Sequence, residues 1–144
     1  MSGVDLAAVA TPFVWLGMVL AISFMEAPLK FRAPGITLAL GLRLGRLVFA
    51  ALNSAEIALA VMLAVAGVAA GVPRAGWFVF ALVVALLAVQ VLVLRPRLDR
   101  RINLILAGQS PRPSPLHLTY VAAEVLKVLA LSVLGAVAAT AVLS

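Results

Sequence analysis

Four side chains with acid–base chemistry lie at helical spacing in the last apolar stretch of the chain. His117, Tyr120, Glu124 and Lys127 follow one another three, four and three residues apart. In a helix this spacing places them on one narrow stripe. The residues around them, up to Leu143, are almost all Leu, Val and Ala, which is typical of a membrane span. Ionisable groups inside a bilayer are costly unless they are paired or face a polar cavity, so the stripe is a candidate functional site.

The other apolar stretches carry polar side chains at a matching depth. Glu26 and Gln90 lie near the ends of the first and third stretches, and Asn53 and Glu56 lie in the second. With a rise of about 1.5 Å per helical residue, all of them fall in one layer with the stripe. The sequence therefore predicts a common pocket, which would bind a ligand through these residues: Glu26, Arg43, Arg46, Asn53, Glu56, Gln90, His117, Tyr120, Glu124 and Lys127.

A purely structural role is the alternative for these charges. The carboxylates could pair with Arg43, Arg46 and Lys127 and so hold the helices together. Buried ion pairs are weak stabilisers, however, because desolvation offsets their attraction. This many charges in an apolar chain therefore favours a binding role. His117 taken alone is also explained as an interfacial side chain, because it stands at a helix start just after Pro115.

Several chemistries are excluded or disfavoured by composition. There is no cysteine and only one histidine, so a cysteine thiolate nucleophile and a bis-histidine haem within one chain are excluded. No nucleotide-binding glycine pattern, nucleophile elbow or zinc motif is present, and we expect no metal site. Trp15 and Trp77 are expected at the outer membrane interface or in contact with lipid.

The elements that position the polar layer are predicted to be membrane-spanning helices. Of the 144 residues, 65% are hydrophobic and 11% are charged, and the mean hydropathy is +1.23. Soluble domains carry roughly 25% charged residues. We expect a single all-α domain, an integral membrane four-helix bundle. Its spans are predicted at about 6–27, 44–69, 77–94 and 116–143, and residues 95–115 are predicted to form a loop with a short interfacial helix at 102–106.

The basic residues predict the orientation of the chain. Four of them precede or begin the second span and five lie between the third and fourth spans, which gives nine of the 11. By the positive-inside rule, both of these segments face the cytoplasm and both termini lie outside. The net charge of +6 therefore reflects topology, and we expect no nucleic-acid partner. The expected location is the inner or plasma membrane, with membrane lipids and further copies of the chain as partners.

The second span resembles that of a known membrane family. Arg46, an alanine, Asn53 and Glu56 recur at the spacings seen in the membrane-associated eicosanoid and glutathione metabolism (MAPEG) family. The resemblance implies a four-span trimer that binds glutathione between subunits, with Arg46, Asn53 and Glu56 as ligand-binding residues. Phe49 stands where the family usually has a second arginine, and the third span lacks the tyrosines that the family uses there.

Three functions are therefore compared. The leading hypothesis is a cytoplasm-facing intramembrane pocket that binds, and in an extended form translocates, a small polar or amphipathic ligand. Its cofactor is unknown and it need not be an enzyme. The alternatives are a MAPEG-like glutathione-dependent enzyme, in which Arg46 or Arg95 would stabilise a thiolate, and a structural or accessory membrane subunit.

Overall fold

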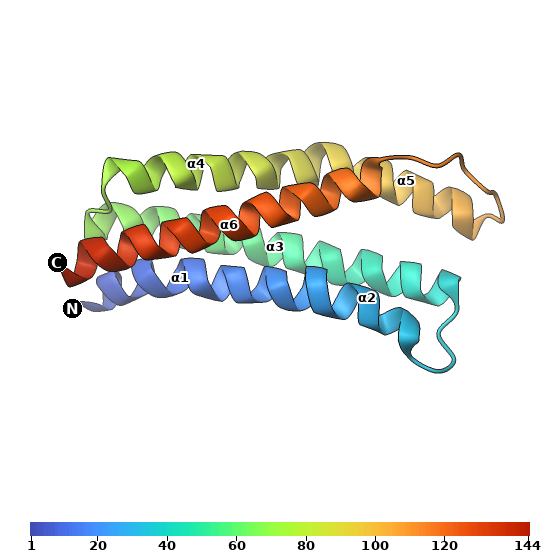
Figure 1. The fold of residues 1–144 in the computed structure, drawn as a ribbon, viewed down its shortest axis with the longest axis horizontal. Coiled ribbons are helices and arrows are strands. Elements are labelled where there is room, and N and C mark those ends of the chain that lie inside the picture. The colour runs from blue at the N-terminus through green and yellow to red at the C-terminus, as the bar shows by residue number, and fades with distance from the viewer.

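The four predicted spans are four long helices that lie side by side (Figure 1). The structure, a computed structural model, describes all 144 residues and contains no β-strand. The four helices are long and apolar enough to cross a membrane, and they cover Gly3–Arg32, Leu38–Ala70, Arg74–Leu106 and Leu116–Leu143. The prediction of an all-α membrane four-helix bundle is confirmed.

The two ends of the bundle differ in what they hold. Both termini lie together at one end, with the short turn at 71–73 (Figure 1). We call this the terminal end. The connections at 33–37 and 107–115 lie at the opposite end, which we call the loop end.

The first long helix passes a proline by widening its turns. α1 (Gly3–Val19) continues through a π-helical segment, Leu20–Glu26, into α2 (Ala27–Leu29) and a 3-10 turn, Lys30–Arg32. The N–H of Ala27 donates to the carbonyl of Ile22, one residue further back than in an α-helix. Pro28 follows, and proline lacks an N–H and clashes with the carbonyl four residues earlier. The wider turn relieves that clash, so the helix does not end at Pro28.

The third long helix uses the same device and extends further than predicted. α4 (Arg74–Val89) continues through a second π segment, Gln90–Leu94, into α5 (Arg95–Leu106). The N–H of Arg95 donates to the carbonyl of Gln90, and Pro96 comes next. The short helix expected at 102–106 is confirmed, but the expectation of a loop before it is wrong for residues 95–101, because the π turn carries the helix past Pro96. Only 107–115 connects α5 to α6 (Leu116–Leu143).

Local signals define the ends of α3 (Leu38–Ala70). The Thr37 side chain accepts a hydrogen bond from the N–H of Leu40 at 3.1 Å, which satisfies a donor that the first helical turn leaves free. At the other end Gly71 adopts φ +69°, a left-handed conformation that glycine adopts without steric penalty. The chain then reverses within two residues into α4.

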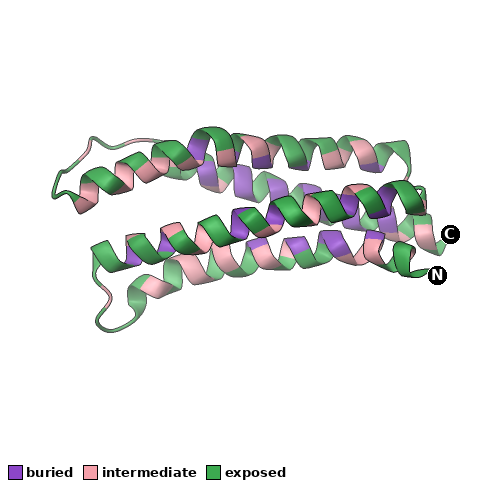
Figure 2. Ribbon diagram, turned by 180° about the vertical axis from the view of Figure 1, so that it is seen from behind, coloured by how far each residue is buried: buried purple, intermediate pink, exposed green.

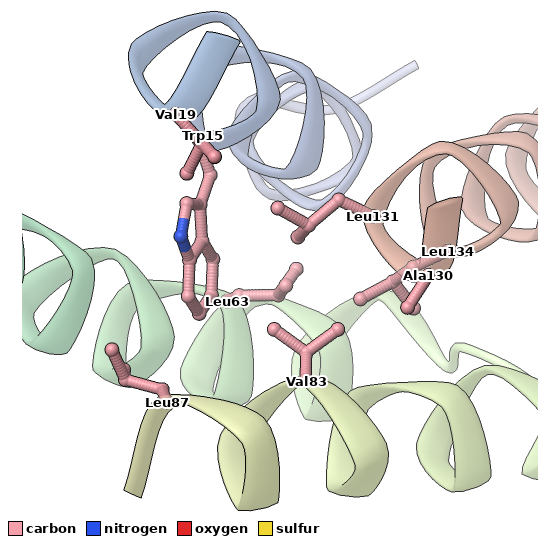
Figure 3. Packing of buried hydrophobic residues seen from close by; sticks show 8 residues of the cluster. All are labelled: Trp15, Val19, Leu63, Val83, Leu87, Ala130, Leu131 and Leu134. Atoms are coloured by element: carbon pink, nitrogen blue, oxygen red, sulfur yellow. The ribbon is translucent and has the colours of Figure 1, made fainter. Parts of the chain in front are cut away.

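All four long helices contribute to one apolar core (Figure 3). Trp15 lies among its members and is fully buried. The core consists of Trp15, Val19, Leu63, Val83, Leu87, Ala130, Leu131 and Leu134. The expectation that Trp15 faces lipid or the membrane interface is wrong, because its ring fills the space between the helices.

The outer surface of the bundle is apolar as well. Buried residues face the neighbouring helices, and exposed residues cover the outward faces (Figure 2). On α3 these exposed residues include Val61, Val65 and Val68, and on α6 they include Leu126 and Leu129. Water would not solvate such a surface, whereas lipid chains would. The helices therefore suit a membrane-embedded protein.

Candidate functional site

A lysine ammonium group lies at the centre of the buried polar layer. Lys127 Nζ is 2.6 Å from Glu56 Oε1 and 2.7 Å from Glu124 Oε1. It also donates to Gln90 Oε1 at 2.7 Å. Its three donors thus have three acceptors, which come from α3, α6 and the π segment of the third helix. We call Glu56, Gln90, Glu124 and Lys127 the charge network.

The charge network is sealed from solvent within the chain. Glu56, Gln90 and Lys127 are 0% exposed and Glu124 is 1% exposed. Ionised groups at such a position are tolerated only with close partners. The network contains two carboxylates and one ammonium group, so it carries a formal charge of −1 when all three are ionised.

The first helix adds two hydrogen-bond donors to the charge network. Trp15 Nε1 donates to Glu56 Oε1 at 2.9 Å, and the Ser23 hydroxyl donates to Glu124 Oε2. Gln90 Nε2 donates to Glu124 Oε1 at 2.6 Å. Ser23 and Gln90 both lie in π segments, and π segments occur often at functional sites. The two widened turns therefore supply donors to the same carboxylate.

Three polar atoms beside the charge network have no hydrogen-bond partner. They are Glu56 Oε2, Asn53 Oδ1 and the Tyr120 hydroxyl, and all three are buried. Asn53 lies three residues before Glu56 on α3, so the two side chains are neighbours on one helix face. Tyr120 lies one turn before Glu124 on α6. Buried polar groups are normally paired, so a set without partners indicates a place where another group binds.

A second polar layer lies towards the loop end. Arg46 donates to the backbone carbonyl of Asp99 at 3.0 Å and to Asn103 Oδ1 at 2.8 Å. These contacts join α3 to α5. Arg95 lies 3.9 Å from Asp99 Oδ1, and its guanidinium carbon is 4.8 Å from the ring centroids of both Phe49 and Tyr120.

The predicted site residues divide into three groups. Glu56, Gln90, Glu124 and Lys127 come together in the charge network, and Asn53 and Tyr120 are buried beside it. Arg46 belongs to the layer at the loop end, and Glu26 lies 3.8 Å from Lys30 on its own helix. Arg43 and His117 are exposed side chains and share no contact with the network.

Residues of both layers were missing from the predicted ligand-binding set. Trp15 and Ser23 donate to the carboxylates, and Asp99 and Asn103 accept from Arg46 at the loop end. Arg95 was considered only in the MAPEG-like alternative, as a residue that would stabilise a thiolate. Position gives one signal, and it concerns Ser23: like Gln90, it lies in a π segment that a proline follows. Trp15 gives no such signal, because tryptophan is enriched at membrane interfaces, whereas Trp15 is buried between the helices.

The two described cavities lie away from the charge network. One of about 420 Å³ lies between the start of α1 and the last turns of α3, and it includes Gly3, Met62 and Ala69 in its lining. The other, of about 10 Å³, includes Gly67, Trp77 and Ala138. Both belong to the terminal end and are lined mainly by apolar side chains. A ligand in either cavity would therefore not contact the carboxylates of the charge network.

The fold and the site together define a class: an integral-membrane four-helix bundle with a buried network of ionisable groups. No protein-family model, curated protein or solved structure matches the chain.

Proposed function

We propose that this protein binds a small polar or amphipathic cation inside the bundle and moves it across the membrane. The observation that carries the proposal is the set of unpartnered acceptors, Glu56 Oε2, Asn53 Oδ1 and the Tyr120 hydroxyl. They lie in or beside a network whose formal charge is −1 when both glutamates and Lys127 are ionised. Acceptors together with excess negative charge favour a cation with N–H donors over an anion or an apolar molecule.

The surroundings of Lys127 support the same ligand chemistry. Its ammonium group is held by two carboxylate oxygens and one amide oxygen, so these helices already form a receptor for an alkylammonium group. A ligand ammonium or guanidinium group would use the free oxygen of Glu56 and the amide oxygen of Asn53. A quaternary ammonium ion has no N–H and would leave these acceptors unpaired.

Access to the site is proposed from the loop end. The unpartnered Tyr120 hydroxyl belongs to a side chain that packs edge-on against Phe49, and Arg95 lies over both rings. Movement of this one guanidinium would uncover the layer below. The π segments at Leu20–Glu26 and Gln90–Leu94 lie at the same depth, and such segments occur often at functional sites.

Methylammonium is expected to raise the melting temperature of the purified protein in detergent. A ligand that binds only the folded state stabilises it by about 2.7 kcal/mol at a hundredfold excess over Kd. Tetramethylammonium at equal ionic strength should have no such effect. The Glu56→Gln variant should lose the response to methylammonium. Equal shifts with both ions, or an undiminished shift in the variant, would contradict the proposal.

The MAPEG resemblance supports an alternative proposal with a different probe. Arg46 Nε is buried and lacks a hydrogen-bond partner, so this guanidinium has capacity for a carboxylate such as those of glutathione. In the same melting experiment, stabilisation by glutathione and none by methylammonium would favour the enzyme. We expect the reverse, because Arg46 is already bonded to Asp99 and Asn103. No response to either probe would favour the structural subunit.

The proposed orientation has its own test. Nine of the 11 basic residues lie in the segments that we place in the cytoplasm. A membrane-impermeant thiol reagent should therefore label cysteines introduced at Ser2 and Ser144 of intact cells. It should not label one at Ser110 until the membrane is opened. Labelling of Ser110→Cys in intact cells would reverse the orientation and place the entrance outside.

A further inference from the structure

The two carboxylates of the charge network are surrounded by different numbers of donors. Glu124 receives Lys127 and Gln90 on Oε1 and Ser23 on Oε2. Glu56 receives Lys127 and Trp15, but both bond to Oε1, and its Oε2 has no partner. Donors that surround a carboxylate favour its ionised form. Glu124 is therefore the better site for the negative charge.

The groups around Glu56 provide one positive charge for two carboxylates. On α6, the charged neighbours of Glu56 are Lys127 and Glu124. α1 contributes the uncharged indole of Trp15, and the π segment of the third helix contributes the uncharged amide of Gln90. On α3 its neighbour Asn53 is also uncharged. Another cation, Arg95, lies over the Tyr120 ring, 4.8 Å from its centroid. A bare carboxylate oxygen here would be an uncompensated buried charge, which is strongly destabilising.

We propose that Glu56 carries a proton on Oε2 and that binding of a cation at this site releases it. The first part follows from donors and charge alone, and the second part rests on the proposed function. The proton makes the network neutral and gives the unpartnered Asn53 Oδ1 a donor one turn away. When an ammonium or guanidinium ion enters, the O–H bond of Glu56 breaks, its electron pair stays on Oε2, and one H⁺ leaves. One cation is thus exchanged for one proton.

The proton can be observed directly because the chain has only three glutamates, Glu26, Glu56 and Glu124. Protein labelled with ¹³C at the glutamate carboxyl carbon, in detergent at neutral pH, should give three resonances. One is expected at the position of a carboxylic acid and two at that of a carboxylate. Glu56→Gln should remove the acid resonance, and the control Glu26→Gln should leave it in place.

A further variant tests whether the protonation of Glu56 depends on the charge of Glu124. In Glu124→Gln, Glu56 becomes the one counter-ion of Lys127, so we expect its resonance to move to the carboxylate position. Three carboxylate resonances in the unmodified protein, or an acid resonance that persists in Glu56→Gln, would overturn the assignment. An acid resonance on Glu56 without any methylammonium response would leave the proton in place and defeat the proposed function.

Discussion

Replacing Lys127 by Met is expected to destabilise the bundle by roughly 3–5 kcal/mol, the usual effect of removing one partner from a buried ion pair. The lysine is 0% exposed and is the one cation within hydrogen-bond distance of Glu56 and Glu124. Methionine has nearly the same length, so the loss comes from the charge rather than from a cavity. Thermal melting or denaturant titration of the purified protein in detergent would measure it.

Second-site variants separate the charge effect from packing. Adding Glu124→Gln to Lys127→Met should restore most of the lost stability, because the network is then neutral with Glu56 protonated. Adding Glu56→Gln should restore little, because the ionised carboxylate of Glu124 stays without a cation. Equal recovery in both double variants would show that the two carboxylates are equivalent, and a stable Lys127→Met single variant would show that the network is solvated.

The sequence was sufficient for the spans and for the depth of the polar layer. Apolar length predicts four crossings, and helical rise brings Glu56, Gln90 and Lys127 to one level. It was not sufficient for the rotation of each helix about its axis. An almost uniformly apolar helix such as α1 has no polar face to orient it, and this is why the buried position of Trp15 was missed. Arg43 and His117 lie at the loop end, as expected, but their side chains are exposed.

The continuation of α4 into α5 depends on backbone geometry that residue types alone do not specify. A proline commonly ends a helix, and Arg95-Pro96-Arg97 was accordingly interpreted as the start of a loop. The π turn before Pro96 removes the clash instead. The first long helix shows the same arrangement, because Pro28 follows its π segment as Pro96 follows the segment in the third helix.

The two helical hairpins carry matching residues at a constant separation. A shift of 68 positions takes Pro28 to Pro96, Glu56 to Glu124 and Gly67 to Gly135. The same shift takes Leu59 to Lys127. Each hairpin therefore contributes one carboxylate to the charge network, whereas the lysine comes from the second hairpin alone. Lys127 contacts both carboxylates, so the larger share of donors on Glu124 comes from Ser23 and Gln90.

Glu56→Gln is expected to abolish cation exchange while leaving the bundle as stable as before. Glutamine reproduces the shape and the donor of a protonated glutamate, so no buried charge is created or lost, and the melting temperature should stay close to that of the unmodified protein. It cannot become an anion, and the loss of a charge-assisted hydrogen bond of about 1.5–3 kcal/mol weakens cation binding roughly tenfold to a hundredfold. The variant has no carboxyl proton to release or regain, so the site cannot return to a protonated state after the cation leaves. Melting curves and flux on the same preparation would separate the two effects.

Proton release from proteoliposomes on addition of guanidinium tests the central claim most directly. Guanidinium stays charged at neutral pH and carries N–H donors, so it does not cross lipid as a free base. With a pH indicator trapped inside, external guanidinium should raise the internal pH as each entering cation expels one proton. Glu26→Gln should behave like the unmodified protein, and Glu56→Gln should show the slow drift of empty liposomes. A folded, reconstituted protein without an internal pH rise, or one whose rise survives in Glu56→Gln, would contradict the assignment of Glu56 as the cation-binding carboxylate.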